Sequence, residues 1–262
     1  MSFEIIDFNT HPFTEPKNNI SLYKEHVDMS VEKTKELYDD LGISTICGSV
    51  IEPYTPEGET EWDKARRNNR IALELKDIYG DFYIPGFHVH PDFIDESINE
   101  MKLMHSFGIN LIGELSPVDY KFDGYISEGF ITLMEEAAKL GMVMSMPTFS
   151  HDMLDKFADI RKDLVCVISK TGEPVGVKRH IERMMKNENY YIDLSGGYAS
   201  FRHGMLRHTI DKVGADRIIF GSGYPFCNPQ IVMGAVLLDP SLTDTEKEKI
   251  LSLNAKTILG IK

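Results

Sequence analysis

Short apolar runs alternate with amphipathic segments eight times along this 262-residue chain. A short apolar run bounded by Gly, Pro or polar residues is typical of a buried strand, and a segment with apolar residues three and four apart is typical of a helix. Eight strand-then-helix units in succession predict a parallel sheet that closes into a (β/α)8 TIM barrel. The predicted strands cover 4–9, 43–49, 82–89, 110–115, 142–146, 164–169, 190–195 and 217–222.

The predicted helices between these strands carry recognisable start and stop signals. Thr60 with Asp63 and Thr243 with Glu246 have the spacing of N-terminal helix caps. A helix that contains Phe130 follows the fourth strand and ends at Gly141. The other helices are predicted at 29–41, 61–79, 93–107, 153–161, 176–187, 203–213, 231–238 and 244–259. Because no linker separates the units, we predict one domain over residues 1–262.

Composition narrows the class of protein. Lys and Arg number 28 against 41 Asp and Glu, a formal net charge of −13, which argues against a nucleic-acid partner or an anionic membrane surface. No apolar stretch is long enough for a membrane span, and no signal peptide is visible, so we expect a cytoplasmic protein. The three cysteines, Cys47, Cys166 and Cys227, form no C-x-x-C pair and are expected to be reduced thiols.

Polar residues stand where the predicted strands end, and active sites of TIM barrels lie at these ends. His11 and Glu114 are candidates to move a proton, because a carboxylate or imidazole held there could act as a general base. His11 could instead only hold its loop by hydrogen bonds, and Glu114 could neutralise a nearby Lys or fix a His. The candidate substrate-binding residues are Asn9, His88, His90, His151, Ser195 and Tyr224.

Lys170 follows the sixth predicted strand and would point into the mouth of the barrel. There its ammonium could bind a substrate carboxylate or phosphate, or its amine could attack a carbonyl to form a Schiff base. The third alternative is a solvated loop lysine. We favour anion binding, since a covalent amine needs a more specific environment.

Three stretches in the expected order resemble the amidohydrolase-related (amidohydrolase 2) family of metal-dependent hydrolases. They are IIDFNTHPF at 5–13, VGADRIIFGSGYPF at 213–226 and EKEKILSLNAKTILGI at 246–261. The resemblance covers most of the chain. It implies a TIM barrel, a divalent metal bound at the ends of the strands, and hydrolysis or decarboxylation of a small molecule. Family members also often pair through their helices, which makes a homodimer an expectation.

The chain departs from that family's metal-binding pattern. The family's first strand carries Asp-x-His-x-His, and here Asn9 replaces the first His while His11 remains. Pro147 and Lys170 stand near two other ligand positions, and Gly223 stands where the family has an Asp. A catalytic zinc site uses about three protein ligands, so we do not expect the usual site. If a divalent metal such as zinc binds, its ligands would be His11, His88, Glu114 and His151.

These observations lead to one function and two alternatives. We expect a hydrolase of a small, carboxylate-bearing amide, ester or lactone that works without the usual metal site. Lys170 would hold the anionic substrate, and His11 or Glu114 would move the proton. The first alternative is an inactive barrel that binds a metabolite or a partner protein. The second is a Lys-dependent lyase or decarboxylase.

Overall fold

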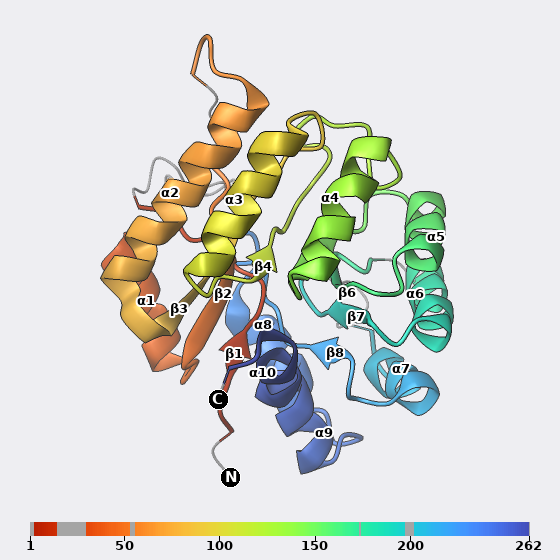
Figure 1. Ribbon diagram of the computed structural model, residues 1–262. Helices are drawn as coiled ribbons and strands as arrows, with labels where there is room; N and C mark the ends of the chain where they lie inside the picture. The colour runs from red at the N-terminus through yellow and green to blue at the C-terminus, as the bar shows by residue number, and fades with distance from the viewer. Residues whose placement is uncertain (1–2, 15–29, 53–55, 173, 197–201, 262) are drawn as a thin grey trace.

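Eight parallel strands form one sheet in which each strand pairs with the next along the chain. This computed structural model describes residues 3–14, 30–52, 56–172, 174–196 and 202–261. The strands are β1 Ile6–Asp7, β2 Thr45–Ser49, β3 Tyr83–Phe87, β4 Leu111–Ile112, β5 Val143–Pro147, β6 Val165–Ser169, β7 Tyr190–Asp193 and β8 Ile218–Ile219. The predicted order of strands and helices is confirmed, and the helices flank the curled sheet (Figure 1).

Backbone hydrogen bonds join the last strand to the first. The N–H of Phe8 donates to the carbonyl of Phe220 at 2.9 Å, and the N–H of Gly223 donates to the carbonyl of Asn9 at 2.8 Å. One residue further on, Thr10 and Tyr224 form an isolated parallel bridge. These contacts close the sheet into a barrel and bring the loop after β8 beside the loop after β1.

Ten α-helices lie in the described residues: α1 Val31–Asp40, α2 Glu61–Tyr79, α3 Ile94–Ser106, α4 Glu128–Lys139, α5 His151–Ile160, α6 Pro174–Lys186, α7 Met205–Val213, α8 Pro229–Leu237, α9 Asp244–Glu248 and α10 Asn254–Leu259. Both predicted N-terminal caps are present, and each of them, at Thr60 and at Thr243, forms a capping box. The predicted helix 244–259 is divided by a π-helical turn, Lys249–Leu253. Residue 29, where the first helix was predicted to begin, lies outside the described residues. None of these helices combines the length and apolarity needed to cross a membrane.

Three strands, β1, β4 and β8, are much shorter than their apolar runs. β4 ends at Ile112 and not at residue 115, because Gly113 has a φ of 87° that leaves the extended region. β1 and β8 also span two residues each, and the chain beyond them continues as irregular backbone. The backbone past these short strands is not part of the sheet, so its side chains are not held to the alternation of a strand and can point toward the centre of the barrel.

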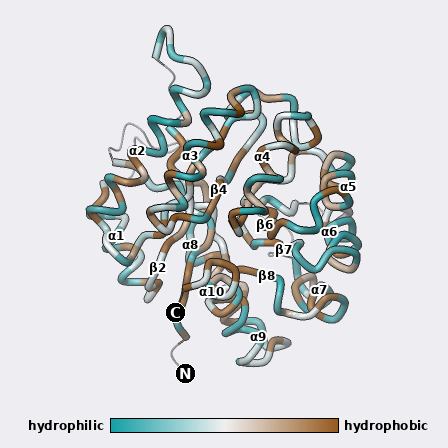
Figure 2. The backbone as a smooth tube through the Cα atoms, in the orientation of Figure 1, coloured by the Kyte–Doolittle hydropathy of each residue, from teal (hydrophilic) through white to brown (hydrophobic). Residues whose placement is uncertain are grey.

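The barrel interior changes from apolar to polar along the strands. One buried cluster inside the barrel contains Ile6, Phe8, Cys47, Leu111, Val143, Val167, Ile219 and Ala255. Side chains two residues apart on a strand share a face, so Ser145 follows Val143 and Ser169 follows Val167 into the interior. A larger apolar cluster packs between strands and helices, and Figure 2 shows hydrophobic residues along the strands. The apolar interior thus supports a polar layer at the carboxyl ends of the strands.

Candidate active site

A cavity of about 260 Å³ opens at the carboxyl ends of the strands. This is where TIM barrels place their active sites. Its wall includes five of the residues that the sequence nominated, which come from the ends of β1, β4, β6 and β7. The cavity is lined by Asn9, His11, Glu114, Lys170, Ser195, Gly196, Gly223, Phe226 and Cys227.

An ion pair joins Glu114 to Lys170 across this cavity, with 2.8 Å between Oε1 and Nζ. The Glu114 side chain is 1% exposed, and that of Lys170 is 45% exposed. Burial alone would raise the pKa of Glu114, but the charges of Lys170 and His11 and the hydrogen bonds of Lys170 and Ser169 lower it to about 2. Desolvation alone would lower the pKa of Lys170, but the Glu114 charge outweighs it and the pKa is raised. Both groups are therefore charged at neutral pH.

The backbone around Lys170 directs its side chain over the end of β7. Lys170 has a φ of 52°, in the left-handed region that few residues other than glycine adopt. Its N–H donates to the carbonyl of Ser195 at 3.1 Å. A Cβ atom at Gly196 would come within 2.9 Å of Lys170 Cγ. Because Gly196 has no side chain, the side chain of Lys170 has space to pass over it and reach Glu114.

The amide of Asn9 connects the ends of two distant strands. Its Nδ2 donates to Glu114 Oε2 at 2.8 Å, to Asp193 Oδ2 at 3.0 Å and to Ser195 Oγ at 3.1 Å. An amide nitrogen carries two hydrogens, so one of them is shared between two acceptors. A single amide nitrogen, Nδ2 of Asn9, thus donates to two carboxyl groups and one hydroxyl.

Asp193, at the end of β7, was not predicted as a site residue. It is fully buried, and its Oδ1 accepts hydrogen bonds from the N–H of Ser195 at 2.7 Å and from the Ser195 hydroxyl at 2.5 Å. Burial, assisted by the charge of Glu114, raises the pKa of Asp193 to about 7 against these hydrogen bonds. A signal was present in the sequence, because Asp193 lies two residues before Ser195 and so shares its face of the strand.

His11 reaches the cavity from the loop after β1. Its Nδ1 lies 3.1 Å from the carbonyl oxygen of Ser49. A carbonyl only accepts, so Nδ1 carries the proton and Nε2 keeps its lone pair. Burial lowers the pKa of His11, although the charge of Glu114 opposes this shift. The imidazole is therefore neutral at pH 7 and able to accept a proton at Nε2.

Three other nominated residues do not line the cavity. His88 donates from Nε2 to the carbonyl of Val50 at 2.8 Å, and its ring lies 4.5 Å from that of Tyr120. His90 bonds the Tyr120 carbonyl through Nε2 and accepts the N–H of Asp92 at Nδ1. The hydroxyl of Tyr224 pairs with the hydroxyl of Thr34 at 3.0 Å, toward α1.

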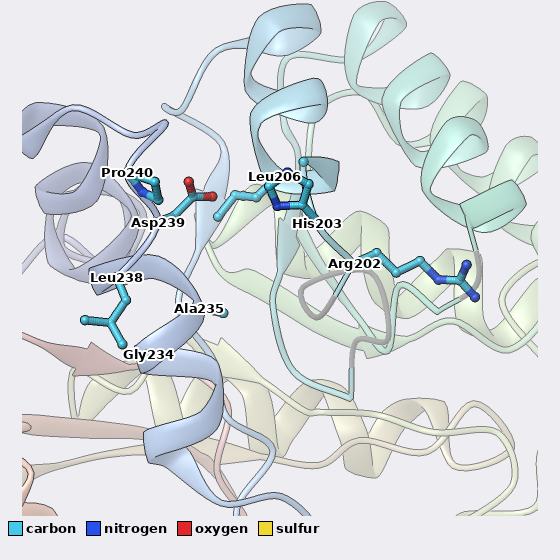
Figure 3. A pocket seen from close by; sticks show the side chains of 9 residues that line it. Arg202, His203, Leu206, Gly234, Ala235, Leu238, Asp239 and Pro240 are labelled. Atoms are coloured by element: carbon cyan, nitrogen blue, oxygen red, sulfur yellow. The ribbon is translucent and has the colours of Figure 1, made fainter.

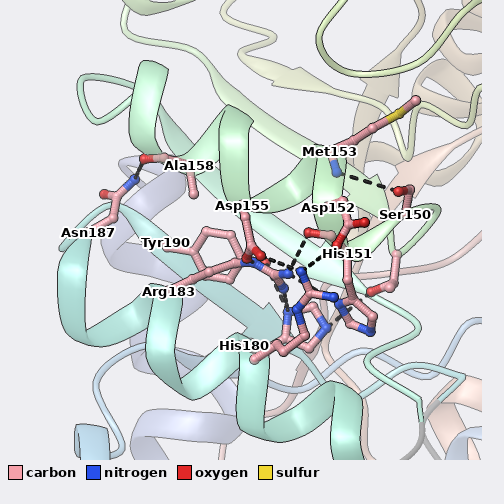
Figure 4. Close-up of polar contacts among 12 residues, drawn as sticks. Ser150, His151, Asp152, Met153, Asp155, Ala158, His180, Arg183, Asn187 and Tyr190 are labelled. Atoms are coloured by element: carbon pink, nitrogen blue, oxygen red, sulfur yellow. Dashed lines mark hydrogen bonds and ion pairs between the residues drawn. The ribbon is translucent and has the colours of Figure 1, made fainter.

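His151, nominated for substrate or metal binding, lies at the first residue of α5 (Figure 4). Its Nδ1 accepts a hydrogen bond from Arg183 of α6 at 3.2 Å, and its ring meets that of His180 edge-on. Arg183 also bonds Asp155 and His180, and Tyr190 bonds His180. We call His151, Asp155, His180, Arg183 and Tyr190 the α5–α6 cluster. None of its members lines the cavity.

A divalent metal does not fit the residues that meet in the cavity. Among the described residues, no group of three or more His, Cys, Asp or Glu is arranged to hold an ion. The Asn9 amide nitrogen, the Lys170 ammonium and the Ser169 hydroxyl all contact the Glu114 carboxylate as hydrogen-bond donors, and the first two have no lone pair with which to bind a cation. Gly223 has a φ of 75° and brings no side chain; a Cβ there would lie 3.4 Å from Ser195 Cβ.

A larger hollow of about 410 Å³ lies between the start of α7 and the end of α8 (Figure 3). It is open to solvent and contains none of the nominated residues. Arg202 and Asp239 are its charged members, and Leu206 and Leu238 its larger apolar ones. The nominated residues at the strand ends line the barrel cavity and not this hollow, so we place the candidate site in the barrel.

Fold and site together define a TIM barrel whose polar residues gather at the carboxyl ends of the strands, where enzymes of this architecture place their active sites. The chain belongs to the amidohydrolase family, because the model of that family matches residues 7–261. The family resemblance predicted from the three sequence stretches is thereby confirmed. No curated protein gives a significant match to the chain.

Solved structures similar to this chain share its fold over nearly their whole length. An uncharacterised TIM-barrel protein from Bordetella bronchiseptica has a TM-score of 0.76 at 20% identity, with 98% of each chain covered. A 2,6-dihydroxybenzoate decarboxylase from Rhizobium has a TM-score of 0.70 at 18% identity, with 98% of this chain and 99% of that chain covered. A probable 2-pyrone-4,6-dicarboxylic acid hydrolase from Acinetobacter baumannii, with citric acid bound, has a TM-score of 0.70 at 15% identity and full coverage of both chains. At these identities the similarity shows the fold alone.

Proposed function

We propose that this protein is a hydrolase of a small molecule that carries a carboxylate and an amide, ester or lactone bond. The observation that carries the proposal is the ammonium of Lys170, whose side chain is 45% exposed, in the cavity wall together with His11. An ammonium in a cavity that is otherwise partly apolar binds a carboxylate by charge and hydrogen bonding. The decarboxylase and the probable dicarboxylic acid hydrolase among similar structures are both named for carboxylates.

In this mechanism Lys170 binds the substrate carboxylate and His11 activates water. Nε2 of His11 accepts a proton from water, and the resulting hydroxide attacks the carbonyl carbon of the amide, ester or lactone. The proton then passes from His11 to the leaving nitrogen or oxygen, which restores the neutral imidazole. Glu114 keeps the ammonium in place and charged. The step uses no metal ion, in accord with the donor groups around Glu114.

Two alternatives are weaker on physical grounds. A Schiff base needs a neutral amine, and the Glu114 charge raises the pKa of Lys170, which favours the ammonium. A decarboxylase remains the second candidate, because structurally similar proteins carry that name. It would use the same Lys170 to bind the substrate carboxylate, which leaves as carbon dioxide, and a protonated group to supply a proton to the carbanion.

The test is a panel of small carboxylate-bearing amides, esters, lactones and benzoates, assayed with chelator-treated protein. We expect at least one to be turned over, and Lys170→Met to weaken its binding at least about tenfold, as for loss of a charge-assisted contact. Lys121→Met is the matched control, because Lys121 also has a positive φ and pairs with Glu61 on the surface.

Two results would contradict the proposal. One is activity that chelation abolishes and zinc restores, which would demand a metal site that the described residues do not provide. The other is equal loss of binding in the Lys170 and Lys121 variants, which would place the anion outside the cavity. Release of carbon dioxide in place of hydrolysis products would select the decarboxylase.

A further inference from the structure

The buried carboxyl group of Asp193 has no part in the hydrolysis described above, yet one hydrogen bond separates it from the cavity. Its Oδ1 accepts the hydroxyl of Ser195 at 2.5 Å. Ser195 lines the cavity and Asp193 does not. A titratable group behind a hydroxyl that faces a cavity is the arrangement through which a proton can enter or leave.

We propose that Ser195 and Asp193 form a proton relay that ends in the cavity. The relay rests on the proposed function, because its proton comes from a bound water or substrate hydroxyl. In the step, the O–H bond of the bound group breaks and its proton bonds to Ser195 Oγ. At the same time the Ser195 hydroxyl proton passes to Oδ1 of Asp193. Asp193 becomes neutral, and the bound group becomes an anion in the cavity that holds the Lys170 ammonium. The reverse transfer returns the proton to the product.

Asn9 fixes the direction of the relay. Its Nδ2 donates to Oγ of Ser195 at 3.1 Å and to Oδ2 of Asp193 at 3.0 Å. A hydroxyl oxygen has two lone pairs and one proton. One lone pair accepts from Asn9 and the proton goes to Asp193, so the second lone pair remains for a proton from the cavity. The backbone N–H of Ser195, which donates to the same Oδ1, holds the two side chains together.

The charges around the relay shift the pKa values of the two carboxyl groups of the site, Glu114 and Asp193, in opposite directions. Glu114 stays ionised because Lys170 pairs with it, and its pKa is lowered to about 2. Asp193 has no cationic partner among its hydrogen bonds and is desolvated, which raises its pKa to about 7. Two carboxyl groups whose environments separate their pKa values in this way take different roles in proton transfer. The geometry and the charges thus agree that Asp193 is the group that exchanges the proton.

Asp7 offers a matched comparison within the same barrel. It too is fully buried, and its pKa is raised to about 6 by desolvation. Its side chain accepts the N–H of Ser222 at 2.8 Å and the hydroxyl of Tyr38 at 3.0 Å. Neither of these two partners lines the cavity. The N–H of Asn9, which does line it, also donates to Asp7 Oδ1 at 3.4 Å, but a backbone amide does not relay a proton as a hydroxyl does. Asp7 therefore shares the burial of Asp193 without a route for a proton.

Infrared spectroscopy of the full chain across pH tests the relay, because the carbonyl stretch of a protonated carboxyl group is distinct from that of a carboxylate. Asp193→Asn should remove one titrating band and Asp7→Asn another. Ser195→Ala should shift the midpoint of the Asp193 band upward by about one pH unit or more, since the ionised form loses a hydrogen-bond donor. Ser222→Ala should leave that midpoint unchanged.

A calorimetric measurement with benzoate, in two buffers of different ionisation enthalpy, asks whether the relay senses the cavity. Near pH 7.5, binding of this anion should be accompanied by uptake of a proton from solvent in the unmodified protein and in Asp7→Asn. No proton should be taken up in Asp193→Asn. An Asp193 midpoint that Ser195→Ala does not move would overturn the relay. If instead that midpoint moves but no panel compound is turned over, the coupled pair stands and the hydrolase proposal fails.

Discussion

Two polar clusters in this molecule, the α5–α6 cluster and the residues that line the barrel cavity, contain similar residues. They differ in how much hydrogen-bonding capacity they leave available to a ligand. The α5–α6 cluster gathers two His, one Arg and one Asp from α5 and α6 and one Tyr from the start of β7 (Figure 4). Arg183 there is 4% exposed and directs its nitrogens to Asp155, His180 and His151. In the cavity, Lys170 keeps nearly half of its surface exposed, and His11 keeps a lone pair at Nε2.

The difference teaches that a group of His and charged residues is a site only where hydrogen-bonding capacity faces a cavity. His180 illustrates the opposite case. Burial and the charge of Arg183 lower its pKa well below the usual value, so it stays neutral. It then accepts from Tyr190 and Arg183 at Nδ1 and pairs with Thr148 at Nε2. Every ring nitrogen is used, and the network serves to attach α6 to the barrel.

The largest effect that separates the two clusters should come from Arg183→Met. Removing the buried guanidinium takes a hydrogen-bond donor from Asp155, from His180 and from both acceptors of His151, and should lower the free energy of unfolding by about 3 kcal/mol. Binding of carboxylates by the folded protein should change less than about twofold. Urea denaturation and calorimetry measure the two quantities. Arg179→Met is the control, because its more exposed ion pairs with Asp152 and Asp155 are screened by solvent and contribute little to stability. A loss of binding in Arg183→Met would join the two clusters functionally.

A smaller effect, dependent on pH, should mark the cavity ion pair. The pKa of Glu114 is about 2 in the folded protein against an ordinary value of 4.5. A lowered carboxyl pKa stabilises the fold above the unfolded value, and this contribution is lost as pH falls from about 4.5 toward 2. As pH falls through this range, the free energy of unfolding should therefore decrease by roughly 2 kcal/mol less in Glu114→Gln than in the unmodified protein.

Denaturation curves between pH 2.5 and 5 measure this difference. Glu135→Gln, on the surface beside Lys139, is the matched control and should follow the unmodified protein. Equal acid sensitivity in the Glu114 and unmodified proteins would show that the Lys170 ammonium does not hold the carboxylate ionised.

The smallest effect should follow from His151→Ala. This half-buried side chain accepts one hydrogen bond from Arg183, while its backbone carbonyl accepts a second at 2.8 Å that the variant retains. The loss of stability should be about 1 kcal/mol or less, without loss of carboxylate binding. A loss of carboxylate binding in a folded His151→Ala protein would indicate that His151 contributes to substrate binding, as the sequence predicted.

The sequence predicted the barrel well because its signals are local. Alternating apolar runs, helix caps at Thr60 and Thr243, and stop signals such as Gly141 act within a few residues, so their reading needs no tertiary information. The strand ends then nominated Asn9, His11, Glu114, Lys170 and Ser195, which line one cavity. His151 was nominated by the same logic, but it begins a helix and turns toward α6.

What the chain alone determined is the order of its strands and helices, the family and the polar character of the strand ends. The tertiary structure decided which of those ends meet. Asn9 and Asp193 are 184 residues apart, and only closure of the barrel brings the amide of one to the carboxyl of the other. Periodicity fixes the face of a strand on which a side chain lies, whereas burial, partner and charge state depend on the residues that the fold places beside it.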